Sequence, residues 1–94
     1  MYHPLIMHIA NVKDLYKYAT NIPKYVEDLI HSFWPGPLTF ILKKSDNTPN
    51  YITGNQDTVA IRMPSNKFTL ELINFFKEPI VAPSANNLEI IYSR

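Results

Sequence analysis

The sequence contains no cysteine, which excludes disulfide bonds, thiolate metal ligands and a cysteine nucleophile. Glycine is scarce, with two residues against eight prolines, so a glycine-rich phosphate-binding loop is excluded as well. No apolar run approaches the roughly 20 residues of a membrane span, and no basic segment precedes an apolar stretch at the N-terminus, so no signal peptide is predicted. These absences favour a cytoplasmic protein without a membrane contact.

The composition is that of a folded domain. The chain has 94 residues, enough for one domain, and 46% of them are hydrophobic, which argues against disorder. The formal net charge is +1, whereas dedicated nucleic-acid-binding domains are usually more basic. Charge can be local, so the balance does not exclude an RNA partner.

The hydrophobic pattern predicts an α/β domain. Short apolar runs predict strands, and apolar residues spaced i, i+3, i+4 and i+7 predict helices. The expected order is strand, helix, helix, strand, strand, helix, strand, which favours a sheet with helices packed on it. The strands are expected at residues 5–9, 38–42, 58–63 and 80–82, the helices at about 12–19, 23–34 and 66–77, and a loop at 45–57.

Polar side chains lie at the ends of three predicted strands. His8 closes the first, Arg62 lies near the end of the third, and Ser84 follows the fourth. If these strands are parallel neighbours, the three side chains meet at one edge of the sheet. Strand alternation places Arg62 on the same face as Thr58 and Ala60, where its guanidinium can bind a carboxylate or a phosphate with two hydrogen bonds.

Each of these residues also has a purely structural interpretation. Arg62 could form a surface ion pair, for example with Asp57, and His8 could be a packed, hydrogen-bonded histidine. Ser84 and Asn86 are also typical of a turn or a helix N-cap.

The sequence offers no good metal site. His3 and His8 are five positions apart, which places them on opposite faces of an extended segment, and His31 lies far away on a predicted helix. No catalytic triad and no close pair of carboxylates is suggested, so no catalytic side chain is predicted.

Four segments of the chain stand out together. They are Pro-Leu-Ile-Met-His-Ile (4–9), Phe-Trp-Pro-Gly-Pro-Leu-Thr (33–39), Asp-Thr-Val-Ala-Ile-Arg-Met-Pro (57–64) and Ala-Pro-Ser-Ala-Asn (82–86). Taken in order over residues 4–86, they resemble the YrdC-like family, the threonylcarbamoyl-AMP synthases of tRNA modification. The resemblance implies a twisted, open, mixed α/β sheet with packed helices and a positively charged concave surface.

The resemblance also implies an activity and a set of ligands. L-threonine, bicarbonate and ATP, the last expected with Mg²⁺, would be joined into L-threonylcarbamoyl-AMP with release of diphosphate. The product feeds the threonylcarbamoyl modification of adenosine 37 in tRNA, so other proteins of that pathway are expected partners. By position in the matching motifs, His8, Arg62 and Ser84 correspond to threonine-binding residues, and Thr58 and Asn86 to ATP-binding residues. Such an enzyme mainly positions its reactants and screens their charge.

The sequence departs from the family pattern at both ends, so residues 1–94 are expected to form a single partial YrdC-like domain. The family has an upstream Lys-x-Arg-Pro segment that this chain does not contain, and His3 stands where the family usually has Asn. After Asn86 the family's Ser-Gly-containing loop is not recognisable. Three hypotheses follow: an enzyme completed by another segment, an inactive fragment of one, or a non-catalytic module that binds tRNA or double-stranded RNA. We expect the isolated chain to make no threonylcarbamoyl-AMP.

Overall fold

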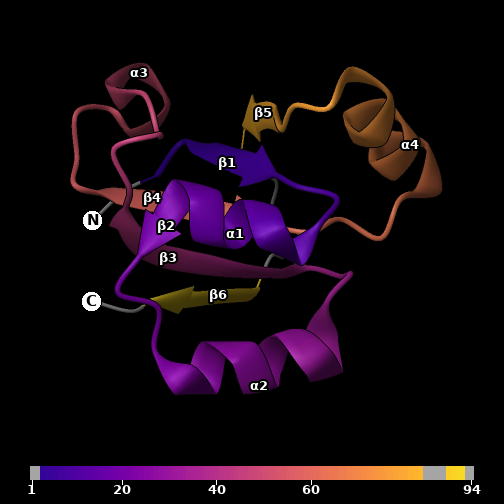
Figure 1. Ribbon diagram of the computed structural model, residues 1–94, viewed down its shortest axis with the longest axis horizontal. Coiled ribbons are helices and arrows are strands. Elements are labelled where there is room, and N and C mark those ends of the chain that lie inside the picture. The colour runs from indigo at the N-terminus through magenta and orange to yellow at the C-terminus, as the bar shows by residue number, and fades with distance from the viewer. Residues whose placement is uncertain (1–2, 84–88, 93–94) are drawn as a thin grey trace.

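A mixed sheet with helices around it makes up the part of the chain that the computed structural model describes, residues 3–83 and the backbone of residues 89–92 (Figure 1). The α/β class predicted from the sequence is therefore confirmed. The strands are β1 (Leu5–His8), β2 (Ala19–Thr20), β3 (Leu38–Lys44), β4 (Thr58–Arg62), β5 (Ile80–Pro83) and β6 (Glu89–Tyr92). The helices are α1 (Val12–Tyr18), α2 (Lys24–Phe33), α3 (Asn50–Thr53) and α4 (Lys67–Phe76).

The strand order is β2-β3-β4-β1-β5, with β6 pairing to β3 beside β2. β1 and β4 are parallel neighbours, whereas β3 runs antiparallel to β4 and β5 runs antiparallel to β1. This mixed pairing determines which strand ends meet. The C-terminal ends of β1 and β4 lie side by side at one end of the sheet. β5 has its N-terminal residue, Ile80, at this end, because it runs in the opposite direction.

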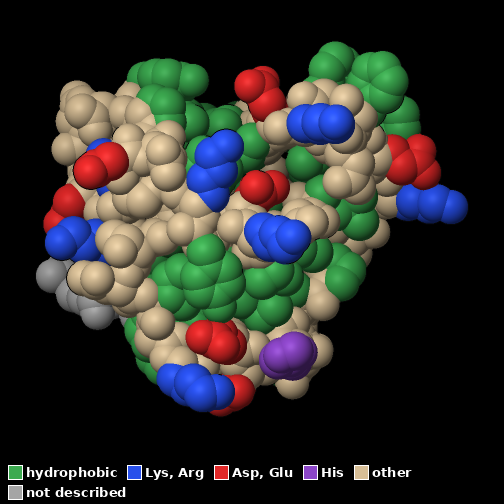
Figure 2. Space-filling view, viewed as in Figure 1, with side chains coloured by type: hydrophobic (Ala, Val, Ile, Leu, Met, Phe, Trp, Pro, Cys, Tyr) green, Lys and Arg blue, Asp and Glu red, His purple; other side chains and the backbone are tan. Residues whose placement is uncertain are grey.

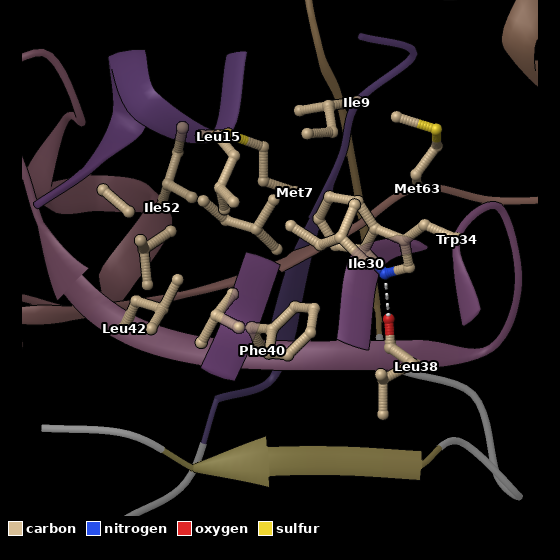
Figure 3. Packing of buried hydrophobic residues seen from close by; sticks show 14 residues of the cluster. Met7, Ile9, Leu15, Ile30, Trp34, Leu38, Phe40, Leu42, Ile52 and Met63 are labelled. Carbon is tan, nitrogen blue, oxygen red and sulfur yellow. Dashed lines mark hydrogen bonds between the residues drawn. The ribbon is translucent and has the colours of Figure 1, made fainter. Parts of the chain in front are cut away.

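One face of the sheet carries the main hydrophobic core (Figure 3). Side chains from alternate positions of β1, β3 and β4 pack there against α1, α2 and α3. They are joined by Trp34, whose indole Nε1 donates a 2.8 Å hydrogen bond to the Leu38 carbonyl and whose ring meets Phe40 edge-to-face, with centroids 5.3 Å apart. The buried members include Met7, Ile9, Leu15, Val26, Ile30, Phe40, Leu42, Ile52, Val59, Ile61 and Met63.

The opposite face, which we call the second face, carries a smaller cluster of Ile6, Ile41 and Ala60. The predicted alternation of β4 is confirmed, because Val59 and Ile61 join the main core and Ala60 joins this cluster. The second face therefore also carries the two polar ends of β4, Thr58 and Arg62.

Most predicted elements are confirmed within one or two residues, and the differences have physical reasons. The short strand β2 exists because Ala19 and Thr20 pair with Lys44 and Lys43, the two residues by which β3 extends beyond the predicted run. This contact joins residues far apart in sequence. One turn of helix, α3, interrupts the predicted loop and ends at Gly54, which has a left-handed φ of 64°. β6, which was not predicted, pairs with β3 in parallel.

Helix α4 forms as predicted but does not bury its aromatic face. Ile73 is its buried residue, whereas Phe68, Phe75 and Phe76 are largely exposed. Hydrophobic side chains accordingly gather on the surface in the region of α4 (Figure 2). Across residues 3–83 and 89–92, none of the helices is long and apolar enough to cross a membrane.

Candidate functional site

A row of residues from neighbouring strands crosses the second face at the end of β1 and β4. Thr39 of β3 pairs with Arg62 of β4, Arg62 pairs with His8 of β1, and His8 pairs with Ile80 of β5. Residues paired across a sheet point to the same face with their Cβ atoms roughly 5 Å apart. The register therefore brings Thr39, Arg62 and His8 together, next to the apolar cluster of the second face. The predicted proximity of His8 and Arg62 is confirmed.

His8 is held in one orientation by backbone carbonyls. Its Nδ1 lies 3.0 Å from the Ile6 carbonyl oxygen and 3.3 Å from the Ile80 carbonyl oxygen. A carbonyl can only accept, so Nδ1 carries the proton and donates. Burial and the neighbouring Arg62 charge lower the pKa of His8, which favours the neutral imidazole. In that form Nε2 is a hydrogen-bond acceptor.

Arg62 is held by the turn that precedes β3. Its Nε donates a 3.0 Å hydrogen bond to the Gly36 carbonyl, and the Gly36 N–H donates a 2.8 Å hydrogen bond to the Met63 carbonyl. Burial lowers the pKa of Arg62, but an arginine remains charged at neutral pH. Among the described residues no ion pair joins Arg62 to Asp57, so the alternative of a surface ion pair is not what the structure shows.

Because Nε of Arg62 is occupied, the two terminal Nη groups remain to bind a ligand. Their planar arrangement suits a carboxylate or a phosphate. The row thus combines a charged donor at Arg62 with a neutral acceptor at His8. A small zwitterion, with a carboxylate and an amine on adjacent atoms, matches this pair.

Thr58 lies at the other end of β4 on the second face, four residues and roughly 13 Å from Arg62. Its hydroxyl lies 2.9 Å from Nε2 of His3, which is also 3.2 Å from the Thr58 carbonyl oxygen. From the sequence, His3 was expected to be a departure from the family's Asn and a poor metal ligand; its contact with Thr58 was not predicted. Thr58 is 5% exposed, whereas Arg62 and His8 at the other end are partly exposed.

The predicted roles of Ser84 and Asn86 fall outside the described residues. The direction of the preceding strand is described, however, and it corrects the expectation of parallel neighbours. β5 is antiparallel to β1, with Ile80 opposite His8 and Pro83 opposite Leu5. The C-terminal end of β5 therefore lies at the opposite end of β1 from His8. The prediction was wrong on this point because an apolar run does not indicate strand direction.

The described residues provide no metal centre at this row. Within residues 3–83 and 89–92 there is no group of three or more histidines and acidic residues placed to hold a metal ion. A hollow of about 400 Å³ lies elsewhere, between α1 and α2, where it is lined by residues such as Tyr16, Glu27 and His31. In the row itself Thr39 is buried, whereas Arg62 and His8 are partly exposed, so a ligand could reach these two and be held by hydrogen bonds and charge.

Fold and row together define an α/β domain with an arginine and a histidine side by side on one sheet face. A protein-family model for Sua5, YciO and YrdC, described as "Telomere recombination", matches residues 1–92. The chain belongs to the Sua5/YciO/YrdC family. This confirms the family predicted from the four segments.

Similar proteins of known name are threonylcarbamoyl-AMP synthases. The chain is 51% identical over 84 residues to that of Pyrococcus abyssi, covering 89% of this chain and 25% of the relative. It is 44% identical over 85 residues to that of Bacillus subtilis, covering 89% and 25% respectively. The chain thus spans about a quarter of the length of these two relatives.

Solved structures share the fold. The crystal structure of Pyrococcus abyssi Sua5 complexed with L-threonine matches with a TM-score of 0.84 and 41% identity, covering 97% of this chain and 32% of that one. Escherichia coli YciO matches with a TM-score of 0.73 at 20% identity, covering 96% and 53%, which supports the fold alone. The family architecture is therefore present in this chain.

Proposed function

We propose that the chain carries part of a threonylcarbamoyl-AMP synthase domain and binds L-threonine on the second face at Arg62 and His8. In the complete reaction, L-threonine, bicarbonate and ATP give L-threonylcarbamoyl-AMP, diphosphate and water. The observation that carries the proposal is the pairing of Arg62 with His8 in one row, a charged donor beside a neutral acceptor.

The chemistry of the row suits an α-amino acid. The Nη groups of Arg62 bind the carboxylate, while Nε2 of His8 accepts a hydrogen bond from the amine or from the side-chain hydroxyl of threonine. Membership of the family supports the choice of threonine, because a structural neighbour with 41% identity was crystallised with L-threonine. The family motif implies Ser84 as a further threonine contact, but the end of β5 that precedes it lies opposite Leu5, so the described residues add no support for this contact.

ATP is proposed to bind toward Thr58 and Asn86, with Mg²⁺ accompanying its phosphates. Thr58 and Arg62 are on the same face of β4, on either side of the small Ala60. This part of the proposal rests on the family motif. Catalysis would then come from holding the threonine amine, bicarbonate and the α-phosphate close together, without a protein nucleophile.

The product would enter the modification of adenosine 37 in tRNA, in the cytoplasm and together with other proteins of that pathway. The alternative, a non-catalytic module for tRNA or double-stranded RNA, has weaker support. Acidic and basic side chains are interspersed on the face shown in Figure 2, and the net charge is only +1.

The test is calorimetric titration of L-threonine into the 94-residue chain and two variants. Arg62→Ala removes the carboxylate contact, and hydrogen bonds to charged groups are worth about 1.5–3 kcal/mol each, so affinity should fall by about 10-fold or more. Lys43→Ala removes an exposed positive charge from the far end of β3 and should leave affinity within about twofold. No binding by the wild-type chain, or equal losses in both variants, would contradict the proposal.

A further inference from the structure

Thr39 carries a buried hydroxyl that finds no partner among residues 3–83, the part of the chain whose side chains the structure describes. Its side chain is fully enclosed, and within that part Oγ1 has no hydrogen-bond partner. Buried polar groups are nearly always hydrogen-bonded, because an unpaired one loses its contacts with water without replacement. Valine has the same shape and the same preference for a strand, so core packing alone does not require a hydroxyl here. The hydroxyl therefore needs an explanation.

The position of Thr39 points to the ligand row. Thr39 is the residue of β3 that pairs with Arg62, so both side chains leave the second face side by side. The hydrogen bond from Arg62 Nε goes to Gly36, three positions before Thr39, which draws the guanidinium from β4 towards the start of β3. The contact thus directs the Arg62 side chain toward β3, the strand that carries Thr39.

We propose that Thr39 is a further ligand-binding residue of the amino-acid site, whose hydroxyl donates a hydrogen bond to the carboxylate that Arg62 binds. This inference rests on the proposed function, and it adds a residue that the sequence analysis did not name. The hydroxyl is enclosed in this structure, so contact with a ligand requires the side chains that cover Thr39 to move.

The contact has a consequence for specificity. Two donors on different strands, Arg62 and Thr39, would fix the orientation of the bound carboxylate. Arg62 alone would leave the carboxylate free to turn with its long side chain. An amino acid bound in this way presents its amine toward His8 on the other side of Arg62. The row would thus bind the carboxylate between β3 and β4 and the amine at β1, which fixes the orientation of the amino acid across the sheet.

The test compares the wild-type chain with Thr39→Val and Thr39→Ser, using thermal unfolding and titration with L-threonine and with L-threoninamide. Thr39→Val should unfold at the same or a higher temperature, because it removes an unpaired polar group, yet bind L-threonine about 10-fold more weakly. Thr39→Ser keeps the hydroxyl and should retain affinity within about threefold. L-threoninamide lacks the carboxylate, so the valine variant should bind it no more weakly than the wild-type chain does.

The outcomes separate this inference from the proposed function. If the wild-type and valine chains bind L-threonine equally, Thr39 is not a ligand-binding residue and the threonine site stands without it. If the valine variant loses affinity for the amide as much as for the acid, the loss is not a carboxylate contact and the inference is wrong. If the wild-type chain binds no threonine, the proposed function fails and this inference fails with it.

Discussion

Gly36 offers a sharp test of how the fold holds Arg62 in place. A Cβ added at Gly36 would lie 2.6 Å from the carbonyl oxygen of Phe33, a backbone atom at the end of α2. Real Cβ atoms essentially never approach another atom so closely, so Gly36→Ala must displace the turn. Gly36 also ties its turn to the end of β4 with two hydrogen bonds. Its N–H donates to the Met63 carbonyl, and its carbonyl accepts from Nε of Arg62.

The cost can be bounded from these two hydrogen bonds. A backbone hydrogen bond contributes about 0.5–1.5 kcal/mol and one from a charged donor about 1.5–3 kcal/mol, so losing both costs roughly 2–4 kcal/mol. A domain of this size shifts its melting temperature by about 4–8 °C for each kcal/mol. Gly36→Ala should therefore lower the melting temperature by at least about 8 °C.

Gly54→Ala is the matched control for glycine replacement. Gly54 has a left-handed φ of 64°, and a Cβ there would meet no atom within 4 Å. The substitution costs about 1 kcal/mol of backbone strain and leaves Arg62 untouched. Both variants should lose stability, but only Gly36→Ala should also weaken L-threonine binding, by about 10-fold, because the displaced carbonyl no longer orients the guanidinium.

The assay is thermal unfolding followed by L-threonine titration well below each variant's melting temperature. A folded Gly36→Ala chain with unchanged threonine affinity would refute the view that the turn orients Arg62. A melting temperature unchanged from the wild-type chain would refute the steric argument itself. Equal losses of affinity in both glycine variants would show that affinity merely follows stability.

Three further predictions concern pH, activity and substrate preference. The pKa of His8 in the folded chain lies below its unfolded value of 6.5. As the pH falls, the unfolded chain therefore takes up this proton before the folded chain does. The contribution of His8 to the free energy of unfolding should be constant above about pH 6.5 and should fall as the pH drops toward the lower folded pKa. His8→Asn should flatten this fall in melting temperature between pH 7.5 and 5; parallel curves for the variant and the wild-type chain would contradict the assignment. The isolated chain should release no diphosphate from ATP that depends on threonine and bicarbonate, and such release would show that no further segment is needed. In an active, longer protein of this family, changing the residue equivalent to Arg62 to Ala should raise the threonine requirement more than the ATP requirement; equal effects would contradict its role.

Local features of the sequence were sufficient to predict most of the fold. Apolar spacing located the helices because one face of each must be buried, and Asn11 and Asn66 cap α1 and α4 with their side-chain oxygens. The periodicity did not show that Phe75 and its neighbours on α4 would stay exposed, because burial depends on what packs against the helix. It also missed β2, since a two-residue strand exists only through its partner.

The candidate site was predicted in part. The alternation of β4 correctly placed Thr58, Ala60 and Arg62 on one face, and the polar ends of β1 and β4 correctly suggested that His8 and Arg62 meet. Strand direction could not be predicted for β5, which reversed the expected position of its C-terminal end. His3 and Thr39 were missed as members of this face because their contacts join residues far apart in the sequence.

By itself, the sequence determined what the chain can hold: no thiol chemistry, no glycine-rich phosphate loop, one small α/β domain, and an arginine and a histidine at strand ends. These properties depend on residue types and on periods of two or 3.6 residues, which are local. Only the tertiary structure decided that Thr39, Arg62 and His8 share one row, that Gly36 holds Arg62, and that His8 is neutral with Nε2 as an acceptor. These features depend on strand register, on burial and on the electric field of a neighbouring charge. All three arise when strands pair, and pairing brings together segments that are far apart in the sequence.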